Sequence, residues 1–108
     1  SAKDIFQAAT INGASAFGRT DLGRLCVHSK ADFSVFSLDT VEMSPVRDVV
    51  KNIVYSATRH SVERVYVNGK CIMKEGVVAG IDEADLTGQL QELAEAAWSK
   101  ERSETSDY

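Results

Sequence analysis

The sequence has few of the residues that build metal sites and disulfide frameworks. Its 108 residues include two histidines, His28 and His60, two cysteines, Cys26 and Cys71, and one proline. A catalytic zinc site uses about three protein ligands, usually with two of them close in sequence, and the chain has no HxH, HExxH or CxxC spacing. Because the two cysteines lie far apart, we expect buried or reduced thiols rather than a disulfide.

Other scarcities exclude whole classes of protein. The formal net charge of −4 argues against a nucleic-acid-binding face, which would be basic. No apolar run approaches the roughly 20 residues of a membrane span, and the first residues lack the layout of a signal peptide. No asparagine lies in an N-x-S/T sequon, so we expect a cytoplasmic protein without a membrane or nucleic-acid partner. Because the chain begins with Ser1, we also expect a cut or processed product.

The composition that remains is that of an ordinary globular chain, 44% hydrophobic and 26% charged. Its length suits one small domain at most and is too short for a (β/α)₈ barrel, which needs about 250 residues. Periodicity and turn signals divide the chain into four segments, at residues 1–18, 19–80, 81–102 and 103–108.

The first segment predicts a helix that ends at Gly18. Ser1 can cap this helix, with Asp4 completing a weak capping box. An apolar stripe with small neighbours follows the helical period and suits close packing against a large surface, and its members are Phe6, Ala9, Gly13 and Phe17.

The second segment mixes strands with one helix. Residues 24–27 and 32–38 read as strands, the second apolar enough to be covered on both faces. Ser44 and Pro45 suit the N-cap and first residue of a helix over 46–57, where valine and isoleucine recur at i, i+3, i+4 and i+7. Residues 62–67 and 70–73 predict a hairpin through Asn68-Gly69, followed by a Glu75-Gly76 turn and Val77-Val78.

The third segment predicts a helix over 82–101 with Asp82 as its cap, and the last, 103–108, a frayed polar tail. One face of this helix is apolar and carries Leu86, Leu90, Leu93 and Ala97. We therefore expect an α+β fold, with flanking helices on a small, mostly antiparallel sheet.

Candidate catalytic residues are few. Cys26 and His28 would share one face of a strand and form a two-ligand half-site, yet two ligands hold a metal poorly. His60 follows Arg59 in a polar loop and is best explained as a solvated side chain. Asp32 precedes an apolar strand, where a strand-start carboxylate is a simpler interpretation than a general base. We assign no residue to a catalytic, cofactor-binding or metal-binding role.

Four motifs together resemble one family, the metal-dependent amidohydrolases. They run in that family's order, and in this chain they read ATINGA at 9–14, GRLCVHSKAD at 23–32, VRDVVKNIVYSA at 46–57 and VERVYVNGK at 62–70. They resemble the family patterns ATxNGA, GxLxxGKxAD, PVxDPVxNLVYSA and VxxVxVNGK. The resemblance runs from near residue 5 to residue 78 and is closest to the branch of S-adenosylhomocysteine, methylthioadenosine and guanine deaminases and triazine hydrolases.

The resemblance implies the C-terminal portion of such an enzyme. In the parent, zinc or iron held by barrel histidines and an aspartate would activate water for deamination or dechlorination of aminopurine- or triazine-like rings, acting on carbon–nitrogen bonds other than peptide bonds. Those ligands would precede Ser1, so we expect this chain alone to be inactive and to hold no cofactor. The segment 1–18 would be the helix that ends the barrel, and 19–80 would form part of a β-sandwich assembled from both ends of the parent chain.

Two departures from the family patterns concern shape. His28 replaces a family glycine, so the turn cannot rely on an easily adopted positive φ and we expect a different shape there. Val49 replaces a proline, which favours a continuous helix.

The expected partners are the missing catalytic barrel and, for the isolated chain, a second copy in a homodimer. The alternative hypothesis is a free-standing interaction or dimerisation module derived from the same domain. A self-sufficient small-molecule binder has little support from the residues, and the substrate of the parent cannot be read from this stretch.

Overall fold

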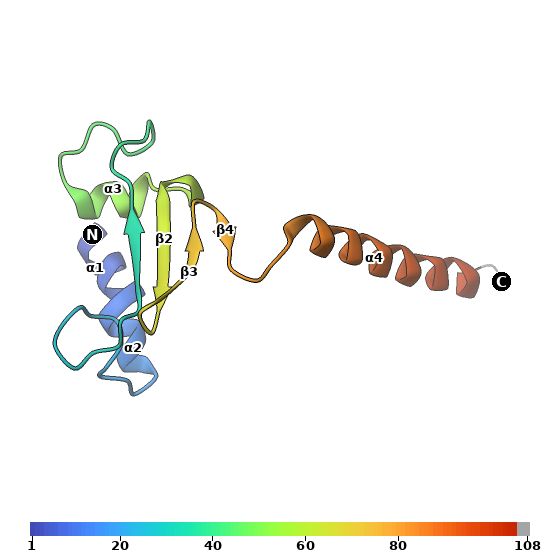
Figure 1. The fold of residues 1–108 in the computed structure, drawn as a ribbon, viewed down its shortest axis with the longest axis horizontal. Helices are drawn as coiled ribbons and strands as arrows, with labels where there is room; N and C mark the ends of the chain where they lie inside the picture. The colour runs from blue at the N-terminus through green and yellow to red at the C-terminus, as the bar shows by residue number, and fades with distance from the viewer. Residues whose placement is uncertain (106–108) are drawn as a thin grey trace.

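A four-stranded antiparallel sheet is the framework of this α+β protein, as the sequence predicts. The computed structural model describes residues 1–105. The strands lie in the order β1-β2-β3-β4, and their bounds are Phe33–Phe36, Val62–Val67, Lys70–Lys74 and Val77–Val78. The helices α1 (Ala2–Gln7), α2 (Gly13–Ala16) and α3 (Val49–Tyr55) gather at this sheet, whereas α4 (Glu83–Thr105) projects away from it (Figure 1).

Both predicted tight turns are confirmed. Asn68 and Gly69 have φ values of 50° and 77° between β2 and β3, and Glu75 and Gly76 have 51° and 80° between β3 and β4. Positive φ at both central residues is the geometry that matches the twist of a two-residue hairpin. The β2–β3 hairpin is also fixed from outside, because Asp32 Oδ1 accepts a hydrogen bond of 2.7 Å from the Asn68 N–H.

Strand β1 is shorter than the predicted 32–38 and lies at an edge of the sheet. It pairs with β2, and the rings of Phe33 and Tyr66 stack across this pair with centroids 4.7 Å apart. The expectation of a strand covered on both faces is therefore wrong for Ser34, whose side chain is exposed.

The first helix is confirmed, including the capping box of Ser1 and Asp4. It has three parts, which are α1 at Ala2–Gln7, a π-helical segment η1 at Ala8–Asn12 and α2 at Gly13–Ala16. The sequence does not predict the π-helical segment. Gly18, with φ of 68°, ends the helix as expected.

Gly23 explains why the loop after this helix can fold back against η1. A Cβ at Gly23 would lie 2.5 Å from the Thr10 carbonyl oxygen, and the residue also has φ of 72°. Thr10 in turn donates from Oγ1 to the Phe6 carbonyl at 2.7 Å, a contact within the helix. Glycine is therefore needed at position 23 for space as well as for backbone conformation.

The strand predicted at 24–27 is wrong. This stretch belongs to a loop, where Ser29 N–H donates to the Cys26 carbonyl at 3.1 Å and Lys30 N–H donates to the Asp21 carbonyl at 2.8 Å. Leu25 and Val27 are exposed, so alternating apolar residues here do not mark a buried strand face.

Helix α3 spans Val49–Tyr55, so the predicted start at Ser44 is wrong and so is the continuous helix expected through Val49. Asp48 is the N-cap, accepting a hydrogen bond from the Lys51 N–H at 3.1 Å. Asn52 Nδ2 donates to the carbonyls of Met43 and Pro45, at 2.7 and 3.3 Å. These bonds hold the preceding stretch as a loop, and the buried Met43 anchors it.

Helix α4 spans Glu83–Thr105 and is capped by Asp82 Oδ1, which accepts from the N–H groups of Ala84 and Asp85. The cap is confirmed. The helix extends to Thr105, so the frayed tail predicted for 103–108 is wrong for residues 103–105, and residues 106–108 lie outside the described part. The radius of gyration is 20.1 Å, whereas a compact domain of 100 residues has about 13 Å. None of the helices in residues 1–105 is long and apolar enough to cross a membrane.

Candidate docking groove

A large apolar groove opens between the first helix, α3 and the strands β1 and β2. Its volume is about 1210 Å³. Apolar side chains from all three layers line it, among them Ile5, Phe6, Phe33, Phe36, Ile53 and Val54. Ile5 is 52% exposed and Phe6 36%, so the helix side of the groove faces solvent.

The helical period accounts for the α3 wall of the groove. In α3, the groove-lining Val50, Ile53 and Val54 follow the i, i+3, i+4 spacing of one helical face. Helix α1 contacts α3, and Ala2 at its start is buried. The stripe of the first helix is only partly covered, since Phe17 remains 88% exposed.

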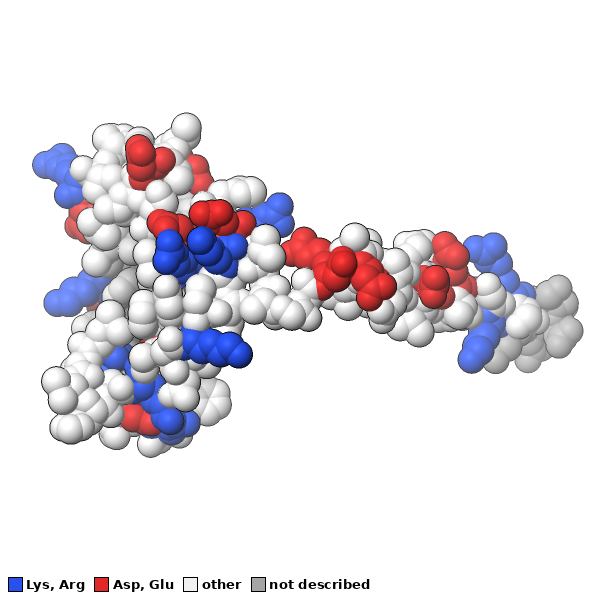
Figure 2. All heavy atoms as spheres, viewed as in Figure 1, with Lys and Arg blue, Asp and Glu red and all other residues white. Residues whose placement is uncertain are grey.

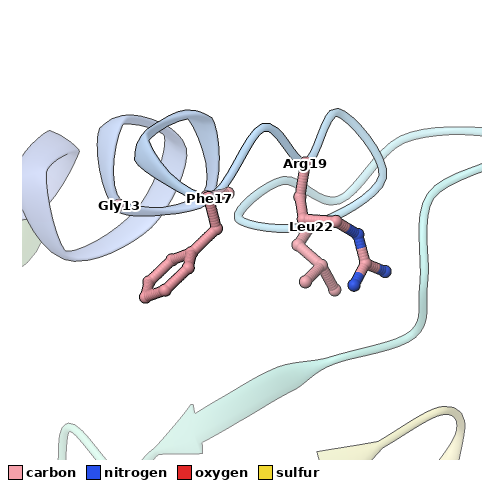
Figure 3. A pocket seen from close by; sticks show the side chains of 5 residues that line it. Gly13, Phe17, Arg19 and Leu22 are labelled. Carbon is pink, nitrogen blue, oxygen red and sulfur yellow. The ribbon is translucent and has the colours of Figure 1, made fainter.

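A second, smaller hollow of about 470 Å³ lies between α2 and the turn that follows it, and its lining includes Phe17, the last residue of that stripe. The side chains of Phe17, Arg19 and Leu22 project to the same side of the chain here (Figure 3). Arg19 donates from both Nε and an Nη to the carboxylate of Asp21, each at 2.8 Å. This pairing lowers the pKa of Asp21 to about 2 and raises that of Arg19, so the guanidinium at this hollow is already matched by a carboxylate.

The structure does not place Cys26 and His28, the pair set aside above as a two-ligand half-site, on a strand. Cys26 lies in a turn with its Sγ 3.0 Å from Ser29 Oγ, and His28 follows in the left-handed region with φ of 70°. His28 thus adopts a positive φ despite its side chain, and the expectation that this turn would do without one is wrong. His60 is exposed in the 3₁₀ helix η2, at Arg59–Ser61.

Within residues 1–105, no group of three or more His, Cys, Asp or Glu side chains is placed to hold a metal ion. The residues of the described chain therefore do not fit the zinc or iron that the family resemblance implies. Asp32 accepts a hydrogen bond from the backbone of the β2–β3 turn. This supports its interpretation as a strand-start carboxylate rather than a general base.

A polar network that the sequence analysis did not predict joins Glu42, in the loop before α3, to Thr58 and Ser61. Glu42 Oε1 accepts hydrogen bonds from Thr58 Oγ1 at 2.9 Å and from the buried Ser61 Oγ at 3.1 Å. The pKa of Glu42 is lowered by its own backbone N–H and by these hydroxyls. The partners lie 16 and 19 positions away, so no local pattern could have indicated them.

The chain is similar in sequence to a known protein family and to two groups of deaminases. The sequence model of the amidohydrolase family matches residues 1–72. A 5′-deoxyadenosine deaminase of Methanosarcina barkeri is 37% identical over 94 residues, covering 87% of this chain and 22% of that protein. A 5-methylthioadenosine/S-adenosylhomocysteine deaminase of Clostridium tetani is 35% identical over 94 residues, with 86% and 22% covered.

Two solved structures share the fold. An adenosine deaminase from Xanthomonas campestris with bound zinc has a TM-score of 0.86 and 28% identity, covering 92% of this chain and 23% of that one. An atrazine chlorohydrolase from Arthrobacter aurescens complexed with zinc has a TM-score of 0.78 and 26% identity, covering 86% and 20%. The chain thus spans about a fifth of the length of the relatives it matches. The predicted resemblance is confirmed.

Proposed function

The chain belongs to the amidohydrolase family, and we propose that it is a non-catalytic structural part of a zinc-dependent deaminase or hydrolase acting on ring compounds. Its place would be the C-terminal portion of that enzyme. The whole enzyme would release ammonia or chloride from an aminopurine- or triazine-like ring, as the names of its relatives suggest. Since the described residues do not fit a metal, we assign no catalytic step to them.

The observation that carries this proposal is the apolar groove. A hollow of about 1210 Å³ lined by phenylalanine, isoleucine and valine side chains is costly to leave in water, because apolar burial contributes about 25 cal/mol per Å². Large exposed apolar surfaces mark sites where another structure packs. The rest of the family chain is the occupant we propose, since the relatives carry it beyond the stretch that this chain matches.

The sheet would take part in the same assembly. β1 and β4 are its two edges, and each edge strand has one side without a strand partner in residues 1–105. Such edges pair readily with further strands. We propose that strands from the remaining part of the enzyme complete a β-sandwich on this sheet and fill the groove from the side of β1.

A chimera tests the proposal. The stretch of the Methanosarcina barkeri deaminase that this chain matches is replaced by the 108 residues of this chain. We expect a soluble enzyme that deaminates 5′-deoxyadenosine within about tenfold of the parent rate, because no substrate-contacting group is exchanged.

The deaminase lacking the stretch altogether is the control and should be insoluble or inactive. An aggregated or inactive chimera, beside an active parent enzyme, contradicts the proposed function. A control that stays active without the stretch does so as well, and it would favour the free-standing interaction module.

For the isolated chain we propose a homodimer that covers the β1 edge and the groove. Sedimentation equilibrium at micromolar concentration should give twice the mass of 11.8 kDa. Ser34→Lys places a charge on the exposed middle of β1 and should yield a monomer, because edge lysines block strand pairing. Thr20→Lys adds the same charge to an exposed loop and should leave the dimer intact. A monomeric wild-type chain would contradict this.

A further inference from the structure

Helix α4 carries a stripe of apolar side chains that no other part of residues 1–105 covers. Leu86, Leu90 and Leu93 are 46%, 58% and 69% exposed, and Ala97 continues the stripe with the same spacing of four, three and four residues. This spacing is the one with which a helix contacts a neighbouring helix or an apolar surface. The stripe is therefore a docking face rather than scattered surface leucines.

Small or uncharged residues of α4 separate this apolar face from the charged faces of the helix. The residues beside the stripe are small or uncharged, such as Thr87, Gln89, Ala94 and Ala96. Acidic side chains gather at the start of the helix and again further along it, and basic ones lie at its far end (Figure 2). A matching surface would be apolar, with basic side chains beside the start of α4.

The arm, as we call α4, is ordered by its own local bonds. Asp82 caps it, and within it Gln89 donates to Asp85 and Gln91 to Glu95, each at 2.8 Å. These bonds explain why the segment is helical, yet all of them stay within the arm. They cannot set the direction in which α4 leaves the sheet.

Part of α4 is included in the match to solved structures. The match covers 92% of the 108 residues in the zinc-bound adenosine deaminase and 86% in the chlorohydrolase. In each case the unmatched residues are fewer than the 23 residues of α4, so part of the arm lies within the match. Most of the length of those chains lies outside the match, so an arm of this kind occurs there as part of a much longer chain.

We propose that the stripe of α4 packs on that remaining part of the enzyme, as a second attachment separate from the groove. This inference rests on the proposed function and names the role of a surface that the groove does not include. α4 then acts as an arm that holds the α+β body, residues 1–81, in a fixed orientation on the larger part. The stripe covers about 16 Å of helix from residue 86 to residue 97, at about 1.5 Å per residue.

Hydrogen exchange on the chimera described above tests the inference, with turnover of 5′-deoxyadenosine as the separate readout for the proposed function. In the isolated 108-residue chain the amides of 86–98 should exchange fast at every protein concentration. In the active chimera they should exchange at least about tenfold more slowly, because opening an element that is packed on another costs more than fraying a free helix.

Two matched variants locate the contact. Leu90→Glu should return the arm of the chimera to the fast exchange of the isolated chain, with Leu90→Ala intermediate. Gly88→Glu adds the same charge on a different face of α4, where an added Cβ meets nothing within 4 Å, and should keep the slow exchange.

Each contrary outcome has its own meaning. An active chimera whose α4 exchanges at the rate of the isolated chain overturns the inference and leaves the proposed function standing. Equal protection in Leu90→Glu and wild type also overturns it. Protection that rises with concentration in the isolated chain would show that a second copy covers the stripe and would overturn it too. An inactive, aggregated wild-type chimera instead rejects the proposed function.

Discussion

The α+β body and the α4 arm are stabilised by contacts that span different distances in the sequence. In the body, Phe33 stacks on Tyr66, Glu42 binds Ser61, and Gly23 allows a loop to reach Thr10. In the arm, side-chain hydrogen bonds such as Gln89 to Asp85 join residues four positions apart. The body is therefore a tertiary structure in its own right, whereas the arm is a helix held by local bonds and exposed along most of its length.

This difference predicts different responses to mutation. Changes in the body should shift a cooperative unfolding transition, because its contacts form together. Changes in the arm should alter helix content without moving that transition, because isolated helices are marginal and open locally. The variants that follow separate the two regions, beginning with the largest effect.

Met43→Ala should be the most damaging substitution in the body. Met43 is fully buried, and truncating a buried methionine costs about 2–5 kcal/mol. Urea unfolding followed by circular dichroism measures the change. Val41→Ala is the control, because Val41 is 91% exposed and its loss should change stability by less than about 0.5 kcal/mol. Equal midpoints for the two variants would contradict a core at Met43.

Gly23→Ala should cost about 3 kcal/mol in the same assay. The added Cβ would meet the Thr10 carbonyl at 2.5 Å, and φ of 72° disfavours any residue with a side chain. Gly18→Ala is matched in backbone conformation, with φ of 68°, but meets nothing within 4 Å. It should cost only about 1 kcal/mol. If both variants lose the same stability, the close approach to η1 is not what requires glycine.

Gly69→Val should cost on the order of 1–2 kcal/mol, since a β-branched residue tolerates positive φ poorly. There is space for the added Cβ, which would lie 3.8 Å from the Ala31 Cβ. The cost is thus conformational rather than steric. An unchanged denaturant midpoint would show that the β2–β3 turn does not need its observed shape.

Asp82→Ala tests most directly whether α4 folds separately from the body, although its effect on stability is small. Loss of an N-cap costs a helix about 1 kcal/mol, so the helical signal of α4 should fall while the unfolding midpoint of the body stays. Asp48→Ala removes the equivalent cap of α3 and should move that midpoint, because α3 packs on α1. A shifted midpoint in Asp82→Ala would mean that the arm folds together with the body.

The smallest effect concerns pH. The Arg19 guanidinium lowers the pKa of Asp21 from 3.8 to about 2. A depressed carboxyl pKa stabilises the fold above the unfolded pKa, and that contribution is lost as the pH falls from near 4 to 2. Carboxyl chemical shifts should show Asp21 titrating near pH 2 and returning toward its ordinary pKa in Arg19→Gln. A pKa that stays near 2 in that variant would contradict the pairing.

The sequence by itself determined the features that depend on neighbours in the chain. The capping box at Ser1, the Asn68-Gly69 turn, the Asp82 cap and the stripe of α4 follow from short-range geometry, and the structure has each of them. The four motifs likewise established the family, because their order is a property of the sequence. No comparable local pattern was available for the groove as a whole, whose walls come from five separate stretches of the chain.

Only the tertiary structure decided where α3 begins and that residues 24–27 form a loop, because local sequence patterns favour other structures at both places. Ser44-Pro45 is a sound helix start by its own pattern, yet Asn52 binds the carbonyls of Met43 and Pro45 and the helix begins after Asp48. Residues 24–27 alternate like a strand but lie in a loop. The physical reason is the same in both cases. A backbone carbonyl or amide takes the partner that the folded chain brings to it, and that partner can lie outside any window in which a sequence pattern is read.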